Sequence, residues 1–217
     1  EVFSKVSLVI SISNMATRCI NAISIVMFPT LRKQKKENLS DIYLKMNTWL
    51  MTVIFLGLIF YMPIATLICM WLPQYADSIK YAVILLPVCT YECKNAMLVT
   101  TYLKTLRKEK VLLISNVVAI VFSFCGMEIT VYAMDNLELA VAVILGALIL
   151  RCVIGEFSIG KELKLVLMNV AFEEMCMVAI FIVCNWWLGT TGVTIYAALV
   201  GIYIWRKRKI LFNLIKK

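Results

Sequence analysis

Histidine is absent from all 217 residues. This removes the side chain most often used as a general base, a metal ligand or a proton switch near neutral pH. No phosphate-binding loop, GxSxG elbow, HExxH or DxD-type motif is present either, so standard nucleophilic and metal catalysis lack their residues. The eight cysteines include no CxxC pair, which favours buried reduced thiols over a metal site. We therefore expect neither an enzyme nor a cofactor.

Charge is also scarce, at 16% of residues, whereas 62% are hydrophobic and the mean hydropathy is +0.89. An average soluble domain is about a quarter charged and roughly half apolar. The excess of apolar side chains requires an apolar solvent, and the lipid bilayer is that solvent. The remaining charge is unbalanced, because 22 Lys and Arg stand against 13 Asp and Glu.

Long apolar runs divide the chain into candidate membrane spans, each needing about 20 residues to cross the hydrocarbon layer. We predict an all-α polytopic membrane protein in which residues 1–217 form one helical bundle of about seven transmembrane helices. The expected spans are 6–31, 48–71, 79–103, 111–133, 137–158, 165–187 and 191–205.

The cations follow alternate connections between these spans. Residues 32–45, 104–110, 161–164 and 206–217 hold five, four, two and six Lys or Arg, whereas the opposite connections hold Lys5 and Lys80 alone. By the positive-inside rule, the four basic stretches and the C-terminus are expected to be cytoplasmic. Topology thus explains the positive charge, and we expect membrane lipids but no nucleic acid as partners.

Two local features have alternative interpretations. The stretch 32–45 fits a short amphipathic helix on the membrane surface and, equally, a plain loop. Pro63 and Pro87 interrupt helix hydrogen bonding within spans, which is compatible with static kinks or with moving hinges.

The first span carries a polar stripe. Its members recur at helical spacing and are Ser4, Ser7, Ser11, Asn14, Arg18, Asn21 and Ser24. Such a stripe cannot face lipid, because an Arg at mid-depth costs at least about 2.5 kcal/mol. It lines a watery cavity or, alternatively, forms hydrogen bonds between helices with Arg18 paired to a carboxylate.

Further polar residues occur in the later spans. In the third span, one helix face holds Thr90, Lys94 and Thr101, and the adjacent face holds Tyr91, Asn95 and Tyr102, so we expect this span to face a cavity over a wide arc. In the fourth, Asn116, Ser123 and Thr130 recur every seven residues, as in a packing seam or a lumen, with Glu128 nearer the outer end. Arg151 is interpreted as a cation that extends toward the inner surface, with Glu173 or Glu174 as a possible partner.

The order of three motifs suggests a family. VMFPTLRKQKKENLSDIYLKMNTWL is a span ending in Phe-Pro before a basic loop, WLPQYADSIKYAVILLP is an outer turn opening a span, and TYLKTLRKEK closes that span. Together they resemble the polysaccharide flippases, for O-antigen and capsule, of the multidrug/oligosaccharidyl-lipid/polysaccharide exporter superfamily. The likeness is sharp over residues 26–110.

The resemblance implies the C-terminal half of a fourteen-span flippase in the bacterial cytoplasmic membrane, which would account for a chain that begins at Glu1. It implies alternating access that carries an undecaprenyl-diphosphate-linked oligosaccharide outward, with a polysaccharide polymerase or glycosyltransferases as partners. On the polar-face argument, Arg18 and Lys94 would bind the diphosphate.

Under the same interpretation, the sugars would contact Asn14, Asn21 and Asn95, and a coupling cation would use Glu128, Glu173 and Glu174. Ion pairing within the bundle explains these carboxylates as well. Two other functions compete with the flippase. One is a cation-coupled multidrug exporter of the same superfamily, and the other is a non-transporting membrane scaffold for polysaccharide synthesis.

Overall fold

The computed structural model describes Arg18, Ile25, Pro29 and residues 31–33, 36–71, 76–133, 137–187 and 189–215. Most of the expected first span, 6–31, therefore lies outside the described residues, and Asn14 and Asn21 lie outside them with it.

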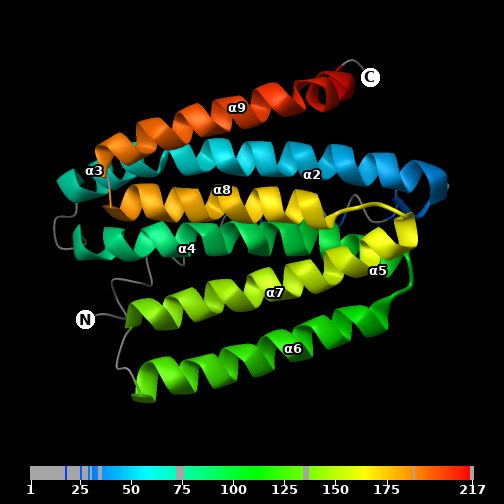
Figure 1. The fold of residues 1–217 in the computed structure, drawn as a ribbon, viewed down its shortest axis with the longest axis horizontal. Helices are drawn as coiled ribbons and strands as arrows, with labels where there is room; N and C mark the ends of the chain where they lie inside the picture. Colours follow the sequence, from blue (N-terminus) through cyan, green and yellow to red (C-terminus); the bar gives the residue numbers. More distant parts are fainter. Residues whose placement is uncertain are drawn as a thin grey trace.

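The described part of the chain is helical and contains no strand, which confirms the all-α prediction. Successive long helices run antiparallel and are joined by short connections (Figure 1). The elements are α2 (Lys36–Ile59), α3 (Tyr61–Trp71), α4 (Ala76–Lys94), the π-helix η2 (Asn95–Thr100), α5 (Thr101–Thr105), α6 (Glu109–Met127), the π-helix η3 (Glu128–Ala133), α7 (Leu137–Leu163), α8 (Met168–Trp187) and α9 (Thr190–Ile215).

Five helical segments are long and apolar enough to cross a membrane: Asn38–Leu67, Val83–Thr105, Glu109–Val131, Leu139–Leu163 and Met168–Trp187. They coincide with the second to sixth predicted spans, with shifted boundaries. The region of the last predicted span, 191–205, is helical within α9, but α9 is not among the five.

The second span starts earlier than its hydropathy suggested. The expected loop at 32–45 is helical from Lys36, and Leu39 and Tyr43 are buried in the bundle rather than turned to a membrane surface. The same span is broken at Phe60, between α2 and α3, because Pro63 has no N–H to donate and its ring clashes with the carbonyl four residues earlier. The proline thus falls in the first turn of α3, where no N–H is needed.

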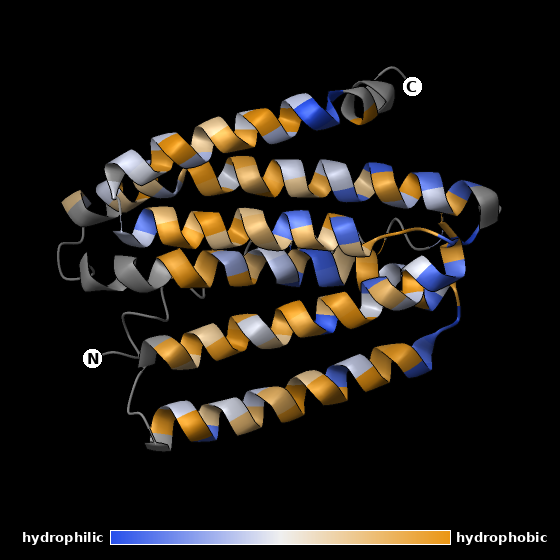
Figure 2. Cartoon of the chain, in the orientation of Figure 1, coloured by the Kyte–Doolittle hydropathy of each residue, from blue (hydrophilic) through white to orange (hydrophobic). Residues whose placement is uncertain are grey.

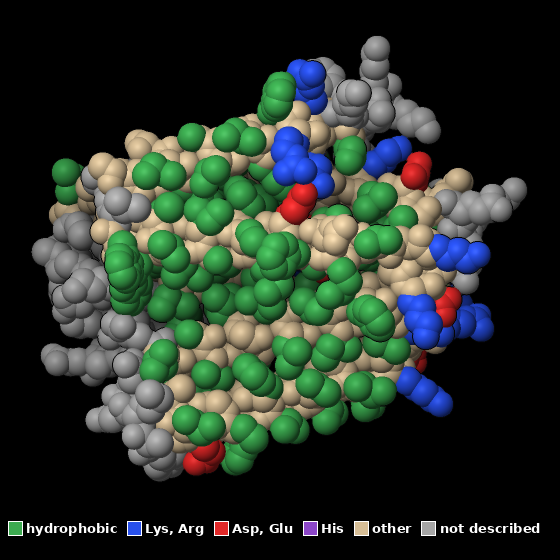
Figure 3. Space-filling view, viewed as in Figure 1, with side chains coloured by type: hydrophobic (Ala, Val, Ile, Leu, Met, Phe, Trp, Pro, Cys, Tyr) green, Lys and Arg blue, Asp and Glu red, His purple; other side chains and the backbone are tan. Residues whose placement is uncertain are grey.

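The connections α5–α6 and α7–α8 lie at one end of the bundle, to the right in Figure 1, together with the start of α2. Lys and Arg side chains gather at this end in the space-filling view (Figure 3). We call it the basic end. Hydrophilic positions are also concentrated toward it, whereas the rest of the helices is mainly hydrophobic (Figure 2).

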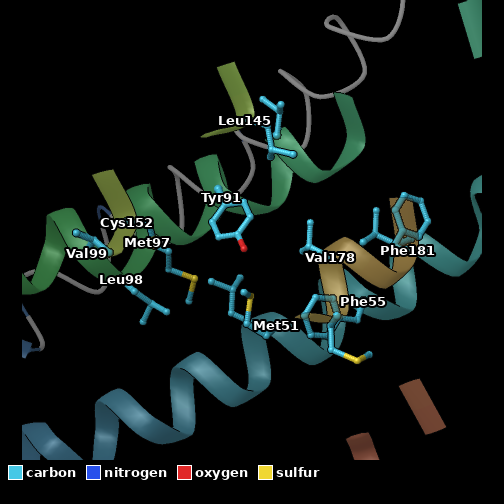
Figure 4. Close-up of a cluster of buried hydrophobic side chains, with 14 of the residues drawn as sticks. Met51, Phe55, Tyr91, Met97, Leu98, Val99, Leu145, Cys152, Val178 and Phe181 are labelled. Carbon is cyan, nitrogen blue, oxygen red and sulfur yellow. The ribbon is translucent and has the colours of Figure 1, made fainter. Parts of the chain in front are cut away.

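Helix α4 with η2 forms the centre of the bundle and contacts α2, α7 and α8. Its polar residues Thr90, Lys94 and Thr101 are buried, and so are Tyr91, Asn95 and Tyr102. The expectation that this arc faces a cavity is therefore wrong: packed helices cover it. The ring of Tyr91 projects from α4 between the side chains of α2 and α8, among Met51, Phe55 and Val178 (Figure 4).

Helix α6 lies at the edge of the bundle and packs chiefly on α7. Most of its surface is apolar and exposed, as expected of a helix that faces lipid. The opposite edge is formed by α9, which packs on α2 and α8.

Helices α8 and α9 cross with almost no space between their backbones. A Cβ atom added at Gly192 of α9 would lie 2.0 Å from the carbonyl oxygen of Cys184 in α8. Gly201, nine residues further along α9, has nothing within 4 Å of the same added atom. The two glycines are therefore a matched pair in one helix, one required by packing and one not.

We predict that Gly192→Ala lowers the thermal unfolding midpoint of the detergent-purified protein by several degrees, because the two helix backbones must separate. Gly201→Ala should leave the midpoint unchanged or raise it, because alanine favours a helix by about 0.5–1 kcal/mol over glycine. Equal effects of both changes would contradict the close crossing. Differential scanning fluorimetry makes the comparison.

Candidate functional site: a buried charge cluster

Lys94, at the end of α4, lies between two glutamates inside the bundle. Its Nζ is 2.7 Å from Oε1 of Glu156 in α7, and it also donates to Oε2 of Glu174 in α8. All three side chains are at most 2% exposed. The charges lie about 10–16 Å from the basic ends of their helices, at 1.5 Å per residue, which places them within the spans.

Helix α2 adds two donors to this cluster. The hydroxyl of Tyr43 donates to Glu156 Oε1 over 2.8 Å, and the amide of Asn47 donates to Glu174 Oε1 over 2.6 Å. Tyr43 and Asn47 are four residues apart and therefore share one helix face. We define the buried charge cluster as these five residues, which join α2, α4, α7 and α8.

The cluster has an excess of negative charge. One ammonium and two carboxylates sum to −1 when all three are ionised. Burying ions costs several kcal/mol each, and only close partners and hydrogen bonds compensate that cost. Glu156 Oε2 has no hydrogen-bond partner among the described residues, nor does Asn47 Oδ1. The cluster can therefore accept one proton or one monovalent cation, which would balance its charge.

Two local features bring the charges together. Gly155, beside Glu156, lets α7 approach η2 so closely that an added Cβ would lie 2.2 Å from Val99 Cγ1. The π-helix η2 begins immediately after Lys94, and Thr101 Oγ1 donates to the carbonyl of Ala96 five residues earlier. Short π-helical segments are frequent at functional sites because they re-aim side chains along a helix.

A hollow connects the basic end with the cluster. It has a volume of about 350 Å³, and its lining includes Glu156, Lys161 and Lys164 of α7 and the following turn. Glu156 is the one member of the buried charge cluster that lines this hollow. An ion or proton that enters here would reach the cluster from the basic end.

The other predicted site residues are not gathered at this cluster. Asn95 is buried and its amide donates to the carbonyl of Leu148 over 3.4 Å, so it joins η2 to α7. Arg18 is exposed, and Glu128 is exposed at the start of η3. Among the members of the predicted set that the structure describes, it brings together only Lys94 and Glu174.

The two candidate partners of Arg151 are engaged elsewhere. Glu174 belongs to the buried charge cluster, and Glu173 pairs with Arg206 and Lys207 of α9, at 3.3 and 3.1 Å. Arg151 lines a different hollow, between α4, α6 and α7.

Glu156, Tyr43 and Asn47 were missed by the sequence interpretation. Glu156 lies near the inner end of its predicted span, and Tyr43 lay in a predicted loop. One available signal is the spacing of Cys152, Glu156 and Ile159, a buried stripe at helical period. No comparable pattern identifies Glu156 as the partner of Lys94, because that pairing depends on how α7 packs.

Metal binding was not expected from the sequence. Among the described residues, no three His, Cys, Asp or Glu side chains are placed to hold a metal ion. The six cysteines whose side chains are described carry reduced thiols, and the sulfurs of Cys89 and Cys93 lie 3.7 Å apart on one face of α4.

The fold defines an all-helical protein with five helices suited to cross a membrane, organised around a buried charge cluster. Comparisons with protein-family models, with curated proteins and with solved structures find no match to the chain.

We predict that Lys94→Met destabilises the protein by about 3–5 kcal/mol, because it leaves two buried carboxylates without their cation. The double change Lys94→Met with Glu174→Gln should recover part of this loss, since one of the two carboxylates is removed. Lys108→Met is the control: its pair with Glu162 is 44% and 28% exposed, so the cost should stay below about 1 kcal/mol. Denaturant unfolding in micelles measures all three, and a double variant no more stable than Lys94→Met would argue against the cluster.

Proposed function

We propose that the chain is part of a membrane carrier that flips an undecaprenyl-diphosphate-linked oligosaccharide across the bacterial cytoplasmic membrane by alternating access. The helical bundle with membrane-length helices supports the membrane part of this proposal. The substrate class rests on the resemblance over residues 26–110. The basic end is the cytoplasmic side under this proposal, by the positive-inside rule.

The observation that carries the transport proposal is the buried charge cluster. Ionisable residues inside spans are costly and generally mark transport pathways or relays. Here, a single Lys holds carboxylates from α7 and α8, while α2 donates to both carboxylates. Neutralising one carboxylate with a proton or cation would weaken one of the two ion pairs, so the packing of α7 against α4 would depend on the occupancy of the cluster. Such a two-state contact is what alternating access requires.

In the substrate proposal, Arg18 binds the diphosphate. A guanidinium offers forked donors to phosphate oxygens, and Arg18 is exposed. Lys94 is already neutralised by two carboxylates, so its proposed part is in coupling rather than in holding the diphosphate. Asn14 and Asn21, on the same predicted helix face as Arg18, are proposed to bind sugar hydroxyls.

The second candidate is a cation-coupled multidrug exporter. The net negative charge of the cluster fits it as well as it fits the flippase, because excess carboxylate attracts a coupling cation whatever the cargo. The two functions differ in cargo alone, so a cargo assay separates them.

We predict that Glu156→Gln, which keeps the size of the side chain and one carboxylate beside Lys94, reduces export of cell-surface polysaccharide at least tenfold in a complementation assay that uses the complete gene. Arg18→Ala should also abolish export, whereas Lys108→Met should support it normally. Immunoblotting of membranes confirms equal protein levels. Intact export by the Arg18→Ala variant would contradict the proposed contact between Arg18 and the diphosphate. Efflux of a cationic dye, with polysaccharide export unaffected by any variant, would decide for the exporter.

A further inference from the structure

Arg151 presents an electrostatic problem that the buried charge cluster does not solve. It lies about 18 Å from the basic end of α7, at 1.5 Å per residue, and so in the middle of a span. It is only partly buried, and it makes no ion pair or hydrogen bond among the described residues. An Arg at this depth costs at least about 2.5 kcal/mol unless a partner or water compensates it.

Arg151 lines a hollow of about 580 Å³ between α4, α6 and α7. A volume of this size is typical of ligand pockets. Two further polar residues of α6, Asn116 and Ser123, line it too, and the buried Oδ1 of Asn116 has no hydrogen-bond partner within the described part of the chain. They are seven residues apart and therefore lie on one helix face, toward Arg151.

The rest of the lining is mainly apolar and continues onto the lipid-facing side of the bundle. Ile120 and Phe124 of α6 line the hollow and are each 67% exposed. A ligand here can therefore place a polar head against Arg151 while an apolar chain lies along α6. Glu92 of α4 also lines the hollow, and its carboxylate would weaken the attraction for an anion.

We propose that this hollow binds the phosphate head group of a lipid, with Arg151 as the charged contact, Asn116 and Ser123 as additional donors, and the acyl or prenyl chain along Ile120 and Phe124. Arginine is the side chain best suited to a phosphate, because its fork can donate two parallel hydrogen bonds. This site is separate from the buried charge cluster. The inference deepens the proposed function. It rests on the proposed function only for the identity of the phosphate lipid that is carried.

The test is equilibrium binding of a fluorescent polyprenyl phosphate to the purified protein in neutral detergent. Wild type should bind it, and Arg151→Gln should bind at least about tenfold more weakly, as expected for loss of a charged hydrogen-bonding partner. Arg151→Lys should be intermediate, because it retains the charge without the fork. Ile120→Trp should also weaken binding, by filling the rim without changing charge, and Glu92→Gln should strengthen it.

Lys104→Gln is the matched control, since it removes an exposed cation outside the hollow and should bind as wild type. Competition shows whether the hollow needs both the phosphate and the chain, and the relative strength of the two phosphate lipids shows which one it prefers. Phosphatidylglycerol and polyprenyl phosphate should compete, whereas polyprenol, which has no phosphate, and inorganic pyrophosphate, which has no chain, should not. Unchanged affinity of a folded Arg151→Gln protein, or equal competition by polyprenol or by pyrophosphate, would overturn the inference.

This assay does not depend on export. If the protein binds the lipid but fails to export polysaccharide, the hollow is a lipid-binding site and the proposed function is rejected. Absent binding in a protein that exports normally would reject the hollow alone.

Discussion

The need to neutralise Lys94 away from water is the constraint on which the arrangement of this bundle depends. A single ammonium, 1% exposed, requires carboxylates at ion-pair distance, and these come from two different helices. Their remaining oxygens need donors, which a third helix supplies through Tyr43 and Asn47. These polar contacts hold the four helices in one relative register. Apolar packing alone would let the helices slide past one another more easily.

The same constraint separates the interior of the bundle from its periphery. Helix α4 is central and carries the polar residues, whereas α6 at the edge exposes apolar side chains and buries Ser115 against its own backbone carbonyl. Arg151 lies between these two environments, beside a hollow and without an ion pair to any residue that the structure describes. Lys94 and Arg151 thus lie at similar depth, but only Lys94 is neutralised by described carboxylates.

Much of the fold could be predicted from the lengths of the apolar runs, because a helix that must cross hydrocarbon has a defined minimum length. Lys94 and Glu174 were recognisable as costly charges within spans. Their mutual pairing was not, since it depends on how α4 and α8 pack, and Glu156 resembled an ordinary charge near a span end. The expectation that residues 90–102 face a cavity failed for another reason: their spacing does not show which helices pack on α4 and η2 and cover these side chains. A 3.6-residue period also does not hold across η2, whose turn is wider.

That wider turn has a consequence for comparing this chain with others. A π-helical turn contains one residue more than the α-helical turn it replaces, so removing one residue between Asn95 and Thr100 would restore a regular α-helix without changing its ends. The residues beyond η2 would keep their present faces, because the wider turn accommodates the extra residue locally. A single-residue gap at this point in an alignment would therefore mark the loss of the π-helical turn after Lys94, although gaps are usually assigned to loops.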